Sequence, residues 1–218
     1  LLPTGVFQGE AYGTTGSQQV GWALIGNGHA SLWSGTAASW VDLHPAAATR
    51  SEAYGVSGGQ QVGRADIGAP HASLWSGSAG SWVDLNPASA SSSMARGISA
   101  GQQTGYAVVN GVTHAAMWMG TDTSFVDLNP PGASTSEARA VSNGEQVGVS
   151  DNHACLWSGT AASAVDLHAY LPAGYSNSIA QAIWSDGGFT YIAGHGHRNS
   201  TNADQALLWR RANACFPQ

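Results

Sequence analysis

The sequence predicts an all-β fold made of five copies of one four-stranded unit. The stretch HASLWSG occurs unchanged at residues 29–35 and 71–77, and related stretches begin at His114, His153 and Gln205. The starts lie about 40 to 50 residues apart, a period that indicates stacked supersecondary units. The chain also contains 29 glycines, which is close to double the usual share of about 7% and implies many turns. No stretch shows the apolar period of a helix.

One unit, read from residue 51, contains four runs of strand length in order. The runs are EAYGVS (52–57), QQVGRADI (60–67), HASLWS (71–76) and SWVDL (81–85). Each run alternates or clusters apolar, aromatic and β-branched residues, which is typical of strands. They are separated by GG, GAP and SGSAG and followed by NP, all of which are turn signals. Each unit is therefore expected to form a four-stranded antiparallel sheet.

Four strands in roughly 42 residues are typical of the blade of a β-propeller. A solenoid would need capping units at its ends, and the terminal units here resemble the inner ones. We therefore expect residues 1–218 to form a single domain, a five-bladed β-propeller. The chain begins within what is elsewhere the fourth strand, because residues 1–13 align with residues 43–55 at a constant offset, and NACF at 213–216 aligns with AASW at 37–40. The last blade is thus expected to be closed by both termini, which removes an exposed sheet edge.

Composition excludes several classes of partner. Charged residues make up 9% of the chain, the formal charge is −6, and all seven cations are arginines without a basic cluster. Nucleic acid is therefore not an expected partner. No apolar run approaches the roughly 18 to 20 residues that span a bilayer, so no membrane span is expected. We expect a monomer that needs no cofactor.

The units resemble the HAF repeat, a family of extracellular bacterial repeat proteins. The pattern is G-Q-x-V-G, then H-A-x-x-W, then D-L, and in the first unit it is carried by Gln19-Val20-Gly21, His29-Ala30, Trp33 and Asp42-Leu43. The third unit departs at Thr104, and the fifth has Gln205 for His and lacks Asp-Leu. The resemblance implies secretion or display at the cell surface. The family has no established activity to carry over.

The repeated His, Trp and Asp are predicted to be structural. In a strand, side chains alternate between faces, so His29 and Trp33 share one face, which we expect to be buried between blades. Buried polar groups need partners, so His, Ser and Asp are expected to satisfy one another within each blade. His, Ser or Thr, Asp and Trp brace each blade in a similar way in tryptophan-aspartate repeat propellers, which these units also resemble. The residues are His29, His71, His114, His153, Trp33, Trp75, Trp118, Trp157, Trp209, Asp42, Asp84, Asp127 and Asp166.

Candidate binding residues stand where charge gathers or where one unit breaks the pattern. Glu10, Glu52 and Glu137 occupy equivalent positions in the inner strands, so they are expected to approach one another near the axis. Like charges at close range call for a cation or an arginine. The fifth unit carries extra residues, GHGHRNSTNADQ at 194–205, expected as a loop at the axial mouth that presents His195, His197 and Asp204. The alternative is a solvated polar loop. No metal site is predicted.

The expected function is a non-catalytic extracellular or cell-surface module for binding or display, with carbohydrate as the favoured partner. The sequence has no G-x-S-x-G, phosphate-cradling loop or H-E-x-x-H. Five-bladed lectins such as tachylectin are also built from nearly identical blades. Two alternatives stay open, an enzyme acting on carbohydrate at the axial mouth and a purely structural repeat domain.

Two cysteines are present, Cys155 and Cys215. Their spacing matches no zinc motif. A disulfide between them requires Cα atoms within about 7 Å, which an alignment does not establish.

Overall fold

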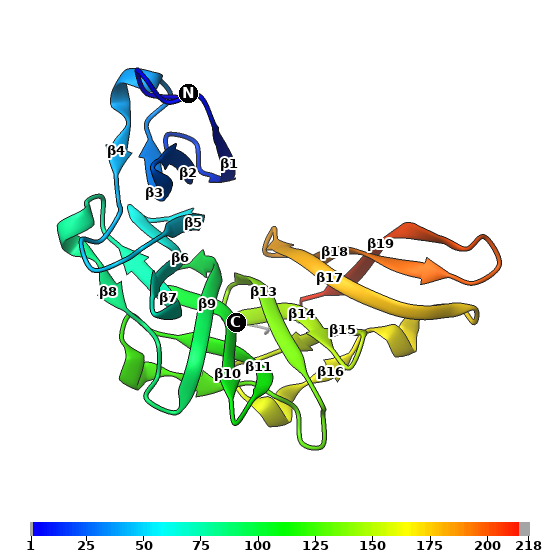
Figure 1. Ribbon diagram of the computed structural model, residues 1–218. Helices are drawn as coiled ribbons and strands as arrows, with labels where there is room; N and C mark the ends of the chain where they lie inside the picture. The colour runs from blue at the N-terminus through cyan, green and yellow to red at the C-terminus, as the bar shows by residue number, and fades with distance from the viewer. Residues whose placement is uncertain (1, 214–218) are drawn as a thin grey trace, which may run out of the picture.

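A computed structural model describes residues 2–213, which form five antiparallel sheets that follow one another along the chain (Figure 1). The first sheet contains β1 (Gly9–Thr14), β2 (Gln19–Ile25), β3 (Asn27–Trp33) and β4 (Val41–Asp42). The second contains β5 (Ser51–Ser57), β6 (Gln60–Ile67), β7 (Ala69–Trp75) and β8 (Val83–Asp84). The third contains β9 (Ala90–Ser99), β10 (Gln102–Val109), β11 (Val112–Trp118) and β12 (Val126–Asp127).

The fourth sheet contains β13 (Ser136–Ser142), β14 (Glu145–Ser150), β15 (His153–Trp157) and β16 (Val165–Asp166). The fifth contains β17 (Tyr175–Ser185), β18 (Phe189–Arg198) and β19 (Ala203–Ala212). Short 3-10 helices η1 (Ala37–Ser39), η2 (Ala79–Ser81), η3 (Asp122–Ser124) and η4 (Ala161–Ser163) precede the fourth strands, and η5 (His168–Tyr170) follows β16. The fourth strand of the second unit, predicted over 81–85, is only Val83–Asp84, because Ser81 belongs to η2 and Trp82 caps it.

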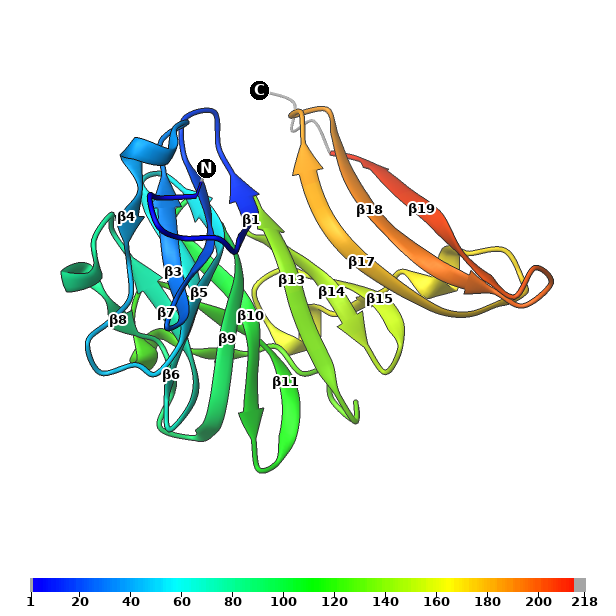
Figure 2. The same ribbon diagram turned by 45° about the horizontal axis from the view of Figure 1, so that its top comes forward.

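The all-β fold class and the succession of antiparallel sheets are confirmed, whereas closure into a ring is not shown. Each sheet is a simple meander, and the first strand of each later sheet packs on the preceding sheet: β5 on β1–β3, β9 on β5–β7, β13 on β9–β11 and β17 on β13–β15. The five sheets follow an arc with the first and fifth at its ends (Figures 1 and 2). No comparable packing joins those two sheets within residues 2–213. The segment predicted to complete the fifth sheet begins at residue 213 and otherwise lies outside the described residues.

The packing of sheet on sheet buries the same positions repeatedly. Leu32, Leu74, Met117 and Leu156 occupy one position on the third strands of the first four sheets and are 4 to 7% exposed. Leu208 holds that position on β19 and is 68% exposed. The difference follows from the arc, because in the described residues no sixth sheet covers the fifth.

Buried serines fasten neighbouring sheets. The Oγ of Ser51 on β5 accepts a hydrogen bond from the backbone N–H of Ala30 on β3, at 2.9 Å. Ser93, Ser136 and Ser178 make the same bond to Ala72, Ala115 and Ala154, at 2.9 to 3.0 Å. These four residues, called the clasp serines below, are 0 to 2% exposed. Each bond satisfies a buried donor that its own sheet leaves unpaired.

The last glycine of the G-Q-x-V-G pattern lies on the second strand of each sheet. It is required because the backbone of the first strand passes close to it. An added Cβ at Gly63 would lie 1.9 Å from the carbonyl oxygen of Glu52. Gly21, Gly105, Gly148 and Gly194 show the same contact at 1.8 to 1.9 Å. This explains why the glycine persists in the divergent fifth unit.

No helix of the described residues is long and apolar enough to cross a membrane.

We predict that Gly63→Ala destabilises the protein by more than about 2 kcal/mol, since the backbone of β5 must move away from β6. Thermal or denaturant unfolding measures this loss. Gly80→Ala is the matched control, because an added Cβ there meets nothing within 4 Å. Equal effects of the two substitutions would contradict the explanation.

Candidate ligand-binding face

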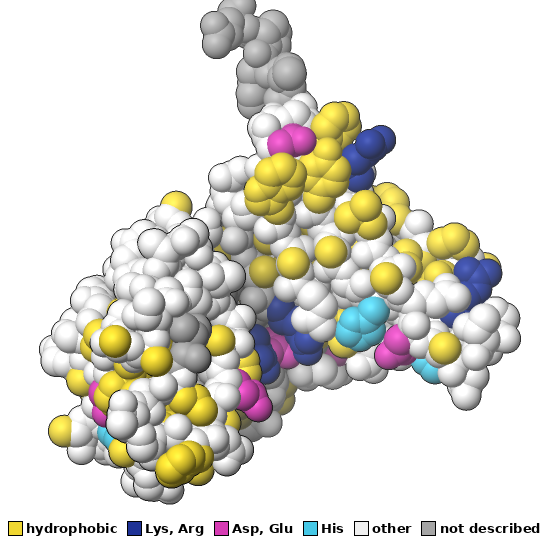
Figure 3. All heavy atoms as spheres, turned by 90° about the horizontal axis from the view of Figure 1, so that it is seen from above, with side chains coloured by type: hydrophobic (Ala, Val, Ile, Leu, Met, Phe, Trp, Pro, Cys, Tyr) yellow, Lys and Arg dark blue, Asp and Glu magenta, His cyan; other side chains and the backbone are white. Residues whose placement is uncertain are grey.

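The first strands of the five sheets lie next to one another and carry the predicted carboxylates. Glu10, Glu52 and Glu137 lie on β1, β5 and β13, and Met94 and Ile179 hold the equivalent positions on β9 and β17. Figure 3 shows arginine and acidic side chains gathered in the hollow between the two ends of the arc. The three carboxylate-bearing residues therefore lie along the same row of inner strands.

A β-bulge follows each of these positions. The pairing between first and second strand skips Tyr12, Tyr54, Arg96, Arg139 and Gln181, one in each sheet. Such bulges turn a side chain out of the regular alternation and are common near binding sites. The five residues, called the bulge set below, place two phenols, two guanidinium groups and an amide along the inner strands.

Glu52 is held by three side chains. Its side chain is 6% exposed, and its carboxylate pairs with Arg50 and, at 3.6 Å, with Arg64. The hydroxyl of Tyr54 donates to the same carboxylate. Burial first, and then this carboxylate, raise the pKa of Tyr54, so its phenol remains a neutral donor.

Glu137 connects three sheets. It pairs with Arg96 of the third sheet and, at 3.2 Å, with Arg139 on its own strand. Arg139 also donates to Gln181 of the fifth sheet at 3.0 Å. Arginine side chains therefore neutralise the charges of Glu52 and Glu137. Within residues 2–213, no group of three or more His, Cys, Asp or Glu side chains is placed to hold a metal ion.

Glu10 lies at the more open end of this face. Its neighbour Tyr12 is 45% exposed, and the two phenol rings of Tyr12 and Tyr54 lie 5.3 Å apart. The indole N–H of Trp22 donates to the Tyr12 hydroxyl at 3.0 Å. Burial, followed by the Glu10 carboxylate, raises the pKa of Tyr12 to about 12. The first two sheets thus combine aromatic faces with fixed donors and acceptors.

The expectation of a loop over residues 194–205 is wrong. The pairing of β18 with β19 continues to Arg198 and Ala203, which leaves a short turn over residues 199–202. His197 pairs with Asp204 across the hairpin, Nδ1 to Oδ1, at 3.0 Å. His195 lies opposite Ile179 on β17, beside the inner strands. Within residues 2–213, no ion pair or hydrogen bond joins these three residues to Glu10, Glu52 or Glu137.

The repeated histidine and aspartate are joined in each of the first four sheets. The Nδ1 to Oδ2 distances are 2.9 Å for His29–Asp42, 2.8 Å for His71–Asp84, 2.7 Å for His114–Asp127 and 3.0 Å for His153–Asp166. The serine of the motif does not bond the side chains of this pair. Instead, Ser31 donates to the carbonyl of His29 and accepts from the indole N–H of Trp40. Trp33, Trp75, Trp118 and Trp157 are 0 to 2% exposed, while Trp209 is partly buried and donates to the Leu167 carbonyl at 3.0 Å.

Two further repeated residues have structural roles that the sequence analysis does not assign. The buried Gln61 joins two turns, because Nε2 donates to the carbonyl of Gly59 at 2.9 Å and Oε1 accepts from the N–H of Gly77 at 2.8 Å. The clasp serines, such as Ser51, are the other set. Their recurrence at one position of each unit was the available signal, but their partners lie in the preceding unit.

The residue after Asp-Leu is histidine in the first and fourth units and asparagine in the second and third. His44 and His168 bond the clasp serines of the next sheets, as Asn86 and Asn129 do. His44 stacks on His29 with ring centroids 3.9 Å apart. Burial first, and then the neighbouring histidine, lower the pKa of both His44 and His168.

We predict that the double variant His44→Asn/His168→Asn keeps its stability at neutral pH and loses less stability in acid. Where the folded pKa lies below the unfolded value near 6.5, the unfolded chain binds more protons, so stability falls as pH drops below about 6.5. Asparagine already serves in the second and third units, and it does not titrate. Melting temperatures at pH 7.5 and 5 measure the difference. An acid loss as large as that of the parent would contradict this account.

Comparison with protein-family models and with curated proteins found no match to this chain.

Proposed function

We propose that this chain is a non-catalytic extracellular or cell-surface module that binds carbohydrate. The repeats resemble those of the extracellular HAF family, and the scarcity of charge, at 9% of residues, suits a neutral ligand. The chain is inferred to act as a monomer, without cofactor. Its binding residues are proposed to lie on the inner strands, where the bulge set lies.

The proposal rests mainly on the arrangement of side chains on the inner side of the first two sheets. Tyr12 and Tyr54 lie side by side there, and their neutral hydroxyls are fixed by Trp22 and Glu52. A hollow of about 380 Å³ is lined by Trp22, Asn27, Thr49 and Arg50, among others, and is linked to Tyr12 only through the Trp22 indole that bonds the Tyr12 hydroxyl. Sugars are recognised by aromatic faces together with a few oriented polar groups. A site of this kind would take a neutral sugar ring with Glu10 and Arg50 at its edge.

A glycan array probed with the labelled protein tests the proposal. Tyr12→Ala is expected to weaken binding of the selected glycan at least tenfold, about 1.4 kcal/mol, because the exposed ring supplies the contact face. Trp184→Ala is the control, since Trp184 is 60% exposed on β17 and stacks on Tyr191 outside the bulge set.

Three outcomes would overturn the proposal. Binding that depends on Trp184 rather than Tyr12 would move the site to the fifth sheet. Absence of glycan binding would favour a purely structural repeat domain. Cleavage of the bound glycan would favour an enzyme acting on carbohydrate.

We also propose that the arc closes into a five-bladed ring completed by both termini. The N-terminal segment supports this, because the Val6 N–H bonds the Pro3 carbonyl at 3.1 Å, as Ala48 bonds Pro45 at 2.9 Å in the connection between the first two sheets. The segment is thus built like a connection between sheets. A hollow of about 400 Å³ between the fourth and fifth sheets is lined by Leu156, Leu167, Ile192 and Trp209, among others. In a closed ring the completed fifth sheet is proposed to cover this space.

Closure predicts that Leu208→Ala destabilises the protein by about 2 to 5 kcal/mol, the cost of truncating a buried leucine. In an open arc the same change, at a side chain 68% exposed, would cost less than about 0.5 kcal/mol. Met119→Ala is the control, because Met119 is 57% exposed and lies away from both ends of the arc. Denaturant unfolding of the two variants separates the alternatives.

A further inference from the structure

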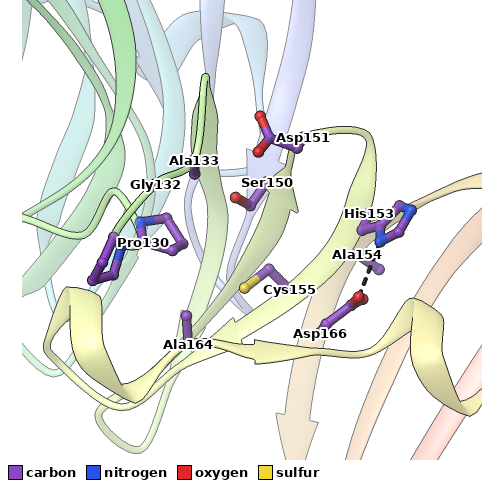
Figure 4. A pocket seen from close by; sticks show the side chains of 11 residues that line it. Pro130, Gly132, Ala133, Ser150, Asp151, His153, Ala154, Cys155, Ala164 and Asp166 are labelled. Atoms are coloured by element: carbon purple, nitrogen blue, oxygen red, sulfur yellow. Dashed lines mark hydrogen bonds and ion pairs between the residues drawn. The ribbon is translucent and has the colours of Figure 1, made fainter.

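The groove between the third and fourth sheets contains a hollow of about 370 Å³ (Figure 4). Its walls come from the connection over residues 130–133, the turn between β14 and β15, and strands β15 and β16. Pro130, Cys155 and Ala164 give it an apolar side, and His153 and Asp166 give it a polar edge. The hollow lies away from the inner strands and does not depend on the proposed carbohydrate site.

An aromatic ring fills this position in the neighbouring grooves. Trp82 of the second sheet packs on the apolar cluster that contains Leu43 of the first sheet. Phe125 of the third sheet packs in the same way on the cluster that contains Leu85. The fourth sheet offers only Ala164.

The backbone presents these residues identically. The φ and ψ angles are −59° and 133° at Trp82, −56° and 129° at Phe125, and −58° and 127° at Ala164. The 3-10 turn before each residue carries the same serine hydrogen bond, such as Ser158 N–H to Ser163 Oγ at 2.8 Å. Because the backbone is unchanged, alanine at position 164 in place of an aromatic residue leaves a space about the size of an aromatic ring.

The residue beneath the ring changes together with the ring. Ser73 accepts the indole N–H of Trp82 at 2.9 Å, and the equivalent of Ser73 is Ala116 where the ring is that of Phe125. Cys155 holds the position in the fourth sheet, 3% exposed, and burial followed by Asp166 raises its pKa to about 12. A neutral, polarizable thiol is a favourable contact for an aromatic ring.

A second departure of the same unit exposes the polar edge. The hairpin between β14 and β15 turns over two residues, Asp151 and Asn152, with φ of 46° and 67°. His153 is consequently 42% exposed, whereas the histidine of the first sheet, His29, is 18% exposed. The Asp151 carboxylate accepts from the N–H of Ser134 at 2.9 Å, which fixes the turn to the opposite wall. Asp166 holds Nδ1 of His153, so Nε2 is the ring nitrogen left to meet a ligand.

We propose that this hollow is a binding site for a small planar aromatic molecule. The ligand ring takes the place that the chain's own Trp82 and Phe125 rings occupy in the preceding grooves, with one face on Ala164 and Cys155. A polar substituent at its edge meets His153 and Asp166. Preformed apolar cavities are known to accept aromatic rings of this size.

The probe is 5-fluoroindole, followed by fluorine NMR during titration of the intact chain. The parent is expected to show saturable binding of one molecule per chain. Ala164→Phe, which restores the side chain of the third unit, is expected to weaken this binding at least tenfold while the melting temperature does not fall. Trp82→Ala is the matched gain-of-site variant, because it opens the same space in the groove between the first and second sheets and is expected to bind a second molecule.

Backbone amide shifts of the parent provide a readout that needs no variant. Shifts on addition of 5-fluoroindole are expected to cluster at residues 130–133, 150–155 and 164–166. Three results would overturn the proposal: no saturable binding by the parent, binding unchanged by Ala164→Phe, or amide shifts confined to another part of the chain.

Discussion

Each sheet of this chain leaves an apolar face that only the next sheet can cover, and the rest of the structure depends on that constraint. Leu32 is 4% exposed because β5 packs on the first sheet, whereas Leu208, at the same position of the fifth sheet, is 68% exposed. Burial of such a side chain contributes roughly 1.5 to 3 kcal/mol, so every sheet is stabilised mainly by its neighbour. The clasp serine adds a hydrogen bond that crosses the interface and closes off a buried backbone donor.

The same close packing creates the candidate ligand-binding face. A glycine in the second strand lets the first strand approach, and the bulge that follows turns one side chain per sheet along the inner strands. Because the units repeat, the sheets share one backbone arrangement. Regions of the molecule differ where the residues of one unit depart from the repeat. Ala164 and the shortened turn before His153 are two departures that meet in one groove, while the exposed Trp184 marks the fifth sheet.

The sequence predicts the strands and the sheet order well, because both follow from local periodicity and turn residues. The pairing of His71 with Asp84 also follows, since alternation places both on one face. The bulge at Tyr54 was not predictable, because it depends on the register between strands. The long β18–β19 hairpin was mistaken for a loop, since Gly-His-Gly-His reads as polar and turn-rich although its backbone pairs throughout. The hollow at Ala164 required knowledge of which sheet each fourth strand faces.

The proposed ring requires the first and fifth sheets to pack on one another within a single molecule. Small-angle X-ray scattering at several protein concentrations tests this most directly. A closed ring of 218 residues predicts a compact particle with a radius of gyration of about 17 Å that is independent of concentration. A clearly larger radius at the lowest concentration would indicate an open arc, and a radius that grows with concentration would indicate that the two sheets pair between molecules; either result would contradict the proposed ring.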